Sequence, residues 1–435
     1  MKRTTGLLIV VFSVLQFGFS VSAFAQTGAV MFHGSQGQVV IPLSDNYTAA
    51  DVGVRAHTNV RIFLPDGGPT PAELPPFTGY LYETPASLAC VYGLVPQVPG
   101  CNPNDTVTDA SGGSKSIAIV DAYDDPDAAS DLAVFSSQFG LPAANLSVVY
   151  ARGSEPQQDP TGGWELEESL DIEMAHAMAP NAKLYLVETP TNSFTDLFNG
   201  VSVATNLVVC GERACPHGGN GQGEISMGWG GSEFSGEQFY DRLMNNFGVV
   251  DFAAAGDEPG VEYPCTSPNV VCVGGTSTAR NLSTGNLLYQ VAWMDAAGGV
   301  SAYEPRPLYQ RAISAIVGPY RGVPDVSFDG GPATGVWIYD SIPYESAPGE
   351  FLPTGWLVAY GTSVGSPALA GIVNAAGHFY SSSFAELQTI YSDPYSASDF
   401  NDVTLGFCGP YVGFAATPGW DFCTGVGTPF GYGGK

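Results

Sequence analysis

The residues of this chain best suited to chemistry are a serine on a tight turn and, elsewhere, two carboxylates one helical turn apart. Ser363 follows the apolar run Leu357–Tyr360 and a Gly-Thr pair, and Pro367 suits the first turn of a helix of small residues. Its hydroxyl would sit at the end of a strand, beside a helix N-terminus that favours negative charge on a carbonyl oxygen. The pattern predicts a nucleophile for acyl transfer, with a helix N-cap as the alternative.

A nucleophilic hydroxyl needs a base, and two acidic residues offer one. Glu167 and Asp171 are four residues apart in a predicted helix, so their carboxylates share one face. Repulsion raises one pKa, and such a pair tends to share a proton. The pair can therefore act as a general base in acid, where imidazole is protonated. The alternative is an acidic, solvated helix face, which is the role expected for Glu165, Glu168 and Glu173.

The histidines fit that role less well. None of the five stands in the His-Gly-Thr-His context that supplies the base in subtilisin relatives. His176 lies inside a predicted helix, where we expect a structural histidine, and His378 only follows the end of the helix after Ser363. A histidine-dependent subtilase is therefore disfavoured.

The elements that must position these groups alternate between strands and helices. The predicted helices include Asp127–Phe139, Glu165–Met178 and Glu237–Asn246. The predicted strands are Ser116–Ala122, Leu146–Ala151, Lys183–Glu188, Glu224–Met227, Val249–Ala254 and Val270–Val273. This alternation predicts an α/β fold with a doubly wound, mostly parallel sheet, helices on both faces and a site at the carboxyl ends of the strands.

The helix at 167–180 reads Glu-x-x-x-Asp-Ile-Glu-x-Ala-x-Ala-x-Ala-Pro, and it resembles the helix that carries the catalytic Glu and Asp of the sedolisin (serine-carboxyl peptidase) family. Further segments follow in the family's order: ISMGWG at 225–230, AAGD at 254–257, EYP at 262–264, VCVGGT at 271–276, PDVS at 324–327 and GTS at 361–363. The resemblance covers roughly residues 80–435. It implies one large subtilisin-like catalytic domain.

The resemblance also implies roles by position. Ser363 would attack the scissile carbonyl and Glu167 would take its proton. Asp171 would orient Glu167 and share that proton, while Asp257, protonated at the working pH, would donate to the developing oxyanion. The residues implied for substrate binding are Ser226, Gly228 and Gly256.

Two C-terminal segments resemble the halves of the family's calcium site. They are Asn401–Thr404 and Pro418–Asp421. An all-oxygen set of carboxylates and backbone carbonyls suits calcium. The ligands that the resemblance implies for one structural Ca²⁺ are the carboxylates of Asp402 and Asp421 and the carbonyls of Val403, Thr417 and Gly419.

Eight cysteines fall in close sequential pairs, which in an exported protein predicts four local disulfides. Metal ligation is the alternative, because His217 follows one of the pairs. The predicted pairs are Cys90/Cys101, Cys210/Cys215, Cys265/Cys272 and Cys408/Cys423.

The first residues predict export. Lys2 and Arg3 precede an apolar stretch over 6–21, and Ala23-Phe24-Ala25 fits a cleavage site, so residues 1–25 are expected to be a signal peptide. The stretch is short for a membrane anchor. We expect residues 26–80 to form a short N-terminal extension or linker, with a reduced pro-segment as the alternative, and 81–435 to form the peptidase domain.

Composition narrows the partners. The chain has 14 Lys+Arg against 42 Asp+Glu, a net charge of −28 at pH 7, which argues against nucleic acid and anionic membranes. We expect a secreted, acid-active serine endopeptidase that acts as a monomer on protein or peptide substrates. Two alternatives stay open: a tripeptidyl-peptidase, and a non-catalytic secreted binding protein on the same scaffold.

Overall fold

The computed structural model describes residues 37–65, 82–95, 101–103, 112–213, 215, 219–352, 354–392, 399–409 and 413–435. The predicted signal peptide lies outside these residues. None of the helices in the described ranges combines the length and the apolar character needed to cross a bilayer.

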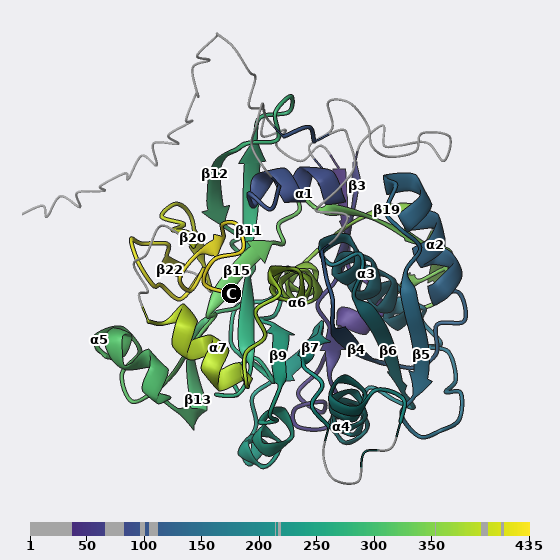
Figure 1. The fold of residues 1–435 in the computed structure, drawn as a ribbon, viewed down its shortest axis with the longest axis horizontal. Helices are drawn as coiled ribbons and strands as arrows, with labels where there is room; N and C mark the ends of the chain where they lie inside the picture. Colours follow the sequence, from purple (N-terminus) through teal and green to yellow (C-terminus); the bar gives the residue numbers. More distant parts are fainter. Residues whose placement is uncertain are drawn as a thin grey trace, which may run out of the picture.

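An eight-stranded sheet forms the centre of the molecule (Figure 1). Its strands run in the order β12-β11-β9-β7-β4-β6-β5, and β15 also pairs with β11. All pairs are parallel except β11 with β12. The strands are β4 (Ser116–Ala122), β5 (Asn145–Tyr150), β6 (Lys183–Thr189), β7 (Gly223–Met227), β9 (Val249–Ala254), β11 (Val271–Arg280), β12 (Leu287–Ala292) and β15 (Val326–Asp329).

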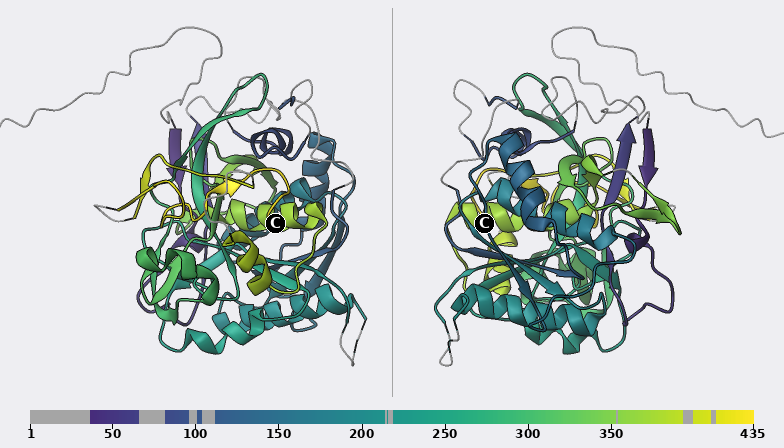
Figure 2. Two further views of the ribbon diagram at one scale, coloured as in Figure 1. Left: turned by 60° about the vertical axis from the view of Figure 1, so that its left-hand side comes forward. Right: turned by 90° about the vertical axis from the view of Figure 1, so that its right-hand side faces the viewer.

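Helices cover both faces of this sheet, as the two turned views show (Figure 2). On one face α3 packs against β4, and α6 packs against β7 and β9; on the other face α4 crosses β4, β6 and β7. The helices are α1 (Pro85–Val91), α2 (Ala128–Phe139), α3 (Gly163–Met178), α4 (Phe194–Cys210), α5 (Ser314–Val317), α6 (Gly365–Ala376) and α7 (Ser383–Ile390).

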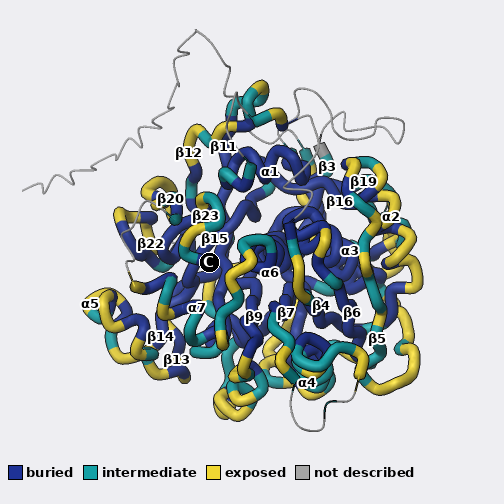
Figure 3. Tube along the Cα trace, in the orientation of Figure 1, coloured by how far each residue is buried: buried dark blue, intermediate teal, exposed yellow. Residues whose placement is uncertain are grey.

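The strands supply a separate apolar core to each face. In β4, Ile117 and Ile119 enter the core on the side of α3 and α6, whereas Ala118 and Val120 enter the core on the side of α4. This is the period-two alternation of a strand that is buried on both faces. Buried residues accordingly fill the centre of the trace, with exposed residues at the rim (Figure 3).

Residues 37–65 contribute strands to two smaller sheets. One has the order β1-β3-β19-β16, and the other has the order β10-β8-β2. Hairpins of two short strands complete the fold: β13 with β14, β17 with β18, β20 with β23, and β21 with β22. The strands of the two sheets are β1 (Gly37–Val40), β3 (Arg61–Pro65), β19 (Gly355–Tyr360), β16 (Val336–Asp340), β10 (Glu262–Tyr263), β8 (Trp229–Ser232) and β2 (His57–Thr58), and those of the hairpins are β13 (Gly299–Pro305), β14 (Tyr320–Val323), β17 (Glu345–Ala347), β18 (Glu350–Phe351), β20 (Phe400–Asn401), β23 (Thr428–Pro429), β21 (Phe407–Cys408) and β22 (Phe414–Ala415).

The predicted α/β architecture is confirmed, including the six strands and the helices near 127–139 and 165–178. The helix predicted over Glu237–Asn246 is wrong. Two short 3-10 helices, Glu237–Phe239 and Asp241–Met244, stand there instead, interrupted at Tyr240.

Candidate active site

Ser363 lies on the turn between β19 and α6, where the sequence places it. A 3-10 turn over Thr362–Val364 joins the strand to the helix, and Ser363 is fully buried. Gly361 precedes this turn with φ +130°. A Cβ at Gly361 would overlap the carbonyl oxygen of Asn59 and press on Asp257 Oδ2, so the turn requires glycine for both its conformation and its space.

The helix that carries the acidic pair is buried along its whole length. α3 lies between the main sheet, α6 and β16. The expectation of a solvated face at Glu165, Glu168 and Glu173 is therefore wrong, since all three are at most 1% exposed. In two of them a backbone N–H group donates to one carboxyl oxygen: Asp159 N donates to Glu165 Oε1 and Tyr339 N donates to Glu173 Oε2.

The structure brings Ser363 and Glu167 together. Ser363 Oγ hydrogen-bonds to Glu167 Oε1 and lies 2.7 Å from the carbonyl oxygen of Gly228. A hydroxyl has one proton, so it donates to Glu167 when that carboxyl is ionised. When Glu167 is protonated, Glu167 donates to Oγ and the hydroxyl donates to Gly228 instead. The contact therefore provides a path for proton transfer between Ser363 and Glu167.

Asp171 and Asp121 surround Glu167 with further carboxyls. A side chain at Gly228 would collide with both Glu167 and Asp171, so a glycine there lets the carboxylates approach the strand. Burial raises the pKa of Glu167 well above its usual range, and the charges of Asp171 and Asp121 raise it further. Burial, and then the charge of Asp121, also raises the pKa of Asp171. The site therefore retains protons that exposed carboxyls would release.

Sequence reasoning gave Asp121 no part in this pair. It stands near the end of β4, fully buried, and burial raises its pKa to about 8. Its position at the carboxyl end of a central strand was the available signal.

Asp257 faces the turn of Ser363 from the loop after β9. Its Oδ1 accepts from Thr362 N (2.7 Å) and Thr362 Oγ1 (2.9 Å). Its Oδ2 has no hydrogen-bond partner among the described residues. Burial raises the pKa of Asp257 well above its usual range, although the charge of Arg61 opposes this. A protonated Asp257 would thus have one free O–H donor beside Gly361.

The residues implied for substrate binding differ in orientation. Ser226 is buried and pairs with Ser366 of α6 through their hydroxyls (2.9 Å), so its side chain serves packing. The carbonyl of Gly228 faces Ser363. A side chain at Gly256 would overlap the carboxylate of Glu262, which shows how closely these two segments pack.

Two buried histidines bear on the prediction that no histidine acts as the base for Ser363. His176 is buried, and its Nε2 lies 2.9 Å from the carbonyl of Pro142, which confirms a structural role. His57, to which sequence reasoning assigned no role, stacks on Tyr47 with ring centroids 4.6 Å apart and lies 3.5 Å from Glu262. Among the hydrogen bonds of the described residues, none joins a histidine to Ser363.

The predicted calcium ligands lie on two loops that the structure holds together. Gly419 N donates to Asp402 Oδ2 (2.9 Å), and Asp421 accepts three backbone N–H bonds, including one from Thr417 (2.9 Å). The described residues contain no cluster of three or more His, Cys, Asp or Glu side chains suited to a metal. A cation here would need backbone carbonyls, such as that of Val403, besides the two carboxylates.

All four predicted disulfides are confirmed, so metal ligation by the cysteines is excluded as their role. His217 itself lies outside the described residues. The bonds are Cys90–Cys101, Cys210–Cys215, Cys265–Cys272 and Cys408–Cys423.

Comparisons with known proteins agree with this geometry. No family model matches the chain. The chain is 30% identical over 358 residues to kumamolisin of Bacillus sp. (strain MN-32), a match over 74% of this chain and 59% of that protein. It is 27% identical over 378 residues to sedolisin of Pseudomonas sp. (strain 101), over 76% of this chain and 60% of that protein. The matches thus span less than two thirds of both relatives.

A solved structure of Pseudomonas sedolisin, a serine-carboxyl proteinase in complex with two molecules of pseudo-iodotyrostatin, has the same fold. Its TM-score is 0.62 at 22% identity, covering 80% of this chain and 96% of that chain. The fold and the site therefore define an α/β protein with a mostly parallel sheet, covered by helices on both faces, whose serine faces carboxyls. The chain is homologous to kumamolisin and to sedolisin, in agreement with the resemblance of its motifs.

Proposed function

We propose that the protein is a secreted, acid-active serine-carboxyl endopeptidase. The observation that carries the proposal is the hydrogen bond from Ser363 to Glu167, in a buried cluster of carboxyls that includes Asp171. The homologue whose structure is solved is named a serine-carboxyl proteinase. The four disulfides support an oxidising, extracellular location.

In the proposed reaction, Ser363 Oγ attacks the scissile carbonyl while its proton passes to Glu167. Asp171 shares the proton of Glu167 and so holds its reactive oxygen toward the serine. The carbonyl oxygen becomes an oxyanion, and the protonated Asp257 and the backbone N–H of Ser363 stabilise it. Glu167 then gives the proton to the departing amine, and water hydrolyses the acyl-enzyme by the same steps in reverse order.

The raised pKa values give this chemistry its acid preference. Glu167 and Asp171 share a proton only while the pair is partly protonated, and Asp257 donates only while it keeps its proton. Activity is therefore expected to fall as the pH rises through the pKa values of these carboxyls. An imidazole base would give the opposite dependence below neutral pH.

The contacts of the residues before Asn59 support cleavage within a chain rather than removal of tripeptides from its N-terminus. Among the chain's own residues before Asn59, His57 and Thr58 pair with β8, and Val54 O accepts a hydrogen bond from Phe194 N (3.1 Å). Val54 stands five residues before Asn59, whose carbonyl reaches Ser363. A tripeptidyl-peptidase accepts only three residues before the cleaved bond. Its binding site would therefore have to be closed beyond the third residue on the N-terminal side of that bond.

We also propose one structural calcium ion between the loops of Asp402 and Asp421. Two carboxylates on loops joined by the bond from Gly419 to Asp402 fit a hard cation. The carbonyls of Val403, Thr417 and Gly419 would complete an all-oxygen set. Such an ion would stabilise the C-terminal loops and take no part in the chemistry.

The rate of cleavage of an unfolded protein from pH 2 to 9, with the Ser363→Ala variant in parallel, tests the proposed function. We expect a maximum below about pH 5 and no activity in the variant. Activity that rises through pH 7 would replace Glu167 by an imidazole base. A folded protein without activity at any pH would favour the binding-protein alternative.

A further inference from the structure

The surface formed by β13, β14 and the helices between them carries exposed apolar side chains. The chain between the two strands forms the 3-10 helix Leu308–Ile313 and then α5. Leu308 is 80% exposed, Ile316 45% and Tyr320 42%. This surface, which we call the β13–β14 face, lies at the rim of the molecule, at the lower left of Figure 3. Exposed apolar side chains that gather in one place mark an interaction site.

The charge of this segment is opposite to that of the chain as a whole. The chain has 42 Asp+Glu against 14 Lys+Arg, but residues 299–323 hold three arginines and a single acidic residue. That acidic residue, Glu304, is buried, and so is Arg321, which has its own ion partner. Arg311 is exposed and Arg306 is half-buried, and neither belongs to an ion pair among the described residues. The face is therefore locally positive.

A neighbouring 3-10 helix extends the β13–β14 face. Gln238 Nε2 donates to Tyr303 O (2.8 Å), which joins the helix Glu237–Phe239 to β13. Phe239 is 60% exposed, and the guanidinium of Arg242 lies 4.0 Å from the centre of its ring. An exposed aromatic ring and an arginine thus stand together beside β13, as exposed aliphatic groups and arginines do between β13 and β14.

The face lies at the far end of the strand that borders Ser363. β8 starts directly after Gly228, whose carbonyl contacts Ser363, and it ends at Ser232. The next residue, Glu233, accepts a hydrogen bond from Ala302 N of β13 (2.8 Å). Five residues of strand span about 17 Å. A peptide laid along β8 would therefore reach the face roughly five or six residues from the bond at Ser363.

The direction of such a peptide follows from the partner that β8 has in this structure. β2 pairs with it antiparallel, with His57 opposite Gly230 and Thr58 opposite Trp229. In this direction the earlier residues of the partner lie nearer to Ser232, the end of β8 that adjoins β13. A substrate in the same direction would present to the face residues that precede its cleaved bond.

We propose that the β13–β14 face binds a second segment of a polypeptide substrate, about six or more residues before the cleaved bond, and that it prefers a segment rich in carboxylate and apolar side chains. This inference rests on the proposed peptidase function. It goes beyond that function because it names a binding surface outside the reacting centre and the chemistry of the segment that the surface takes.

The charge and the apolar side chains together specify this occupant. Arg242, Arg306 and Arg311 complement carboxylates, which are ionised above about pH 4. Leu308 and Ile316 offer apolar contact, and arginine and aromatic residues are enriched at the energetic centres of protein interfaces. An anionic lipid surface would also attract arginines, but the net charge of −28 on the whole chain opposes it. A segment of an unfolded polypeptide touches the face alone.

Two peptide substrates test this inference with the full chain at pH 5. Both contain the same core of about four residues on each side of the cleaved bond, which is too short to reach the face. The longer peptide adds a tail of about ten glutamate, leucine and phenylalanine residues before the core. We expect the tail to raise kcat/KM about tenfold through a lower KM, because a bound tail raises the effective concentration of the core at Ser363.

A charge-reversed variant and a matched control locate the effect. Arg242→Glu with Arg311→Glu changes two exposed arginines of the face and should remove most of the gain from the tail, while cleavage of the short peptide stays the same. Lys115→Glu with Arg213→Glu makes the same change of charge at two exposed residues, before β4 and after α4, and should keep the gain. A tail with lysine in place of glutamate should give no gain.

Fluorescence polarisation of the labelled tail on Ser363→Ala measures binding without cleavage. The tail should bind about tenfold more weakly when Arg242→Glu and Arg311→Glu are added. Equal cleavage of the long and short peptides, or an equal gain in the face variant and its control, refutes this inference and leaves the proposed function standing. A folded chain that cleaves neither peptide refutes the proposed function and, with it, this inference.

Discussion

Glu386 offers a measurement of how buried carboxyls link stability to pH. It lies on α7, which packs on β9 and β11, and it has no contact with Ser363 among the interactions of the described residues. The side chain is 1% exposed, and its Oε2 has no hydrogen-bond partner in the described part of the chain. Burial raises the pKa of Glu386 to about 8, although the positive charge of Lys435 opposes this.

The sign of the effect follows from this raised pKa. An unfolded glutamate has a pKa of about 4.3. Below that value both states are protonated, and this group adds no pH dependence. Between about 4 and 8 only the folded state keeps the proton, so the free energy of unfolding falls by about 1.4 kcal/mol per pH unit. By pH 6 the loss from Glu386 amounts to about 2 kcal/mol.

Glu386→Gln removes this titration while it preserves the shape of the side chain. We expect the variant, relative to its parent, to gain about 2 kcal/mol of unfolding free energy between pH 4 and pH 6. Urea unfolding followed by tryptophan fluorescence measures it, in a Ser363→Ala background that prevents digestion. Glu350→Gln, at an exposed glutamate, is the matched control. If the difference between Glu386→Gln and its parent is the same at pH 4 and 6, the argument from burial is wrong.

Three further outcomes follow from contacts in the site and the core. Asp257→Ala should lower kcat/KM by about 10²–10³-fold, whereas Asp257→Asn, which keeps a donor at every pH, should lose less and stay active to higher pH than the parent; equal losses of kcat/KM in the two variants would exclude an oxyanion role. Asp325→Ala leaves the buried guanidinium of Arg321 without its ion partner at 2.7 Å, so the free energy of unfolding should drop by about 3–5 kcal/mol, and an unchanged urea midpoint would contradict this. A calcium chelator should lower the melting temperature of the protein but not that of a double variant, Asp402→Asn with Asp421→Asn; no bound calcium by atomic absorption would refute the site.

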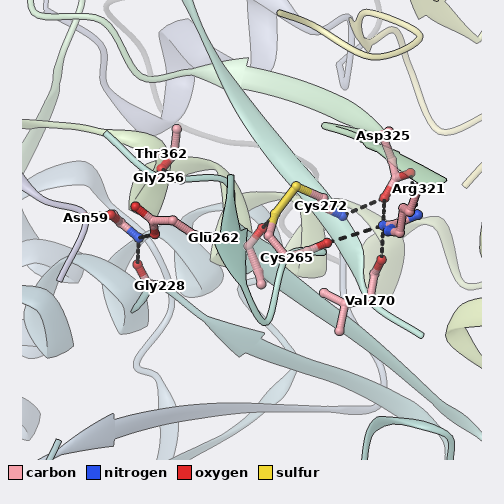
Figure 4. The surroundings of a disulfide bond; sticks show 12 residues. Asn59, Gly228, Gly256, Glu262, Cys265, Val270, Cys272, Arg321, Asp325 and Thr362 are labelled. Atoms are coloured by element: carbon pink, nitrogen blue, oxygen red, sulfur yellow. Dashed lines mark hydrogen bonds and ion pairs between the residues drawn. A yellow bond between two sulfur atoms is a disulfide. The ribbon is translucent and has the colours of Figure 1, made fainter. Parts of the chain in front are cut away.

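The ion pair between Arg321 and Asp325 lies beside a disulfide (Figure 4). Cys265–Cys272 closes the loop between β10 and β11, and Arg321 donates to the carbonyl of Cys265 while Asp325 accepts from Cys272 N (2.8 Å). The ion pair therefore also holds the loop between β10 and β11 against the segment that follows β14. Its loss is expected to loosen both segments.

The sequence was sufficient for the parts of the site that depend on local pattern. The spacing of Glu167 and Asp171, and the turn at Ser363, are local features, and β4 and β9 have the predicted bounds. The burial of Glu165, Glu168 and Glu173 could not be predicted in this way. A solvated acidic helix and a buried one have the same sequence pattern, and only the packing of α6 and β16 on α3 distinguishes them.

Contacts between distant segments were equally beyond sequence reasoning. Asn59 lies in a stretch with weak strand character, far from Gly228 and Glu262 along the chain. No residue pattern around it indicates that its carbonyl meets Ser363. The register of β2 on β8 and of β3 on β19 creates this contact, and such pairings are set by the whole fold.

The pairing of β3 with β19 also has a consequence for biosynthesis. β3 is made early and β19 late, about 290 residues apart, so this part of the sheet forms only when most of the chain is complete. When β19, the strand before Ser363, is made, its partner β3 has already been made. A nascent chain would therefore assemble its candidate active site only after β19 has been made and has paired with β3, and it would lack that site until then.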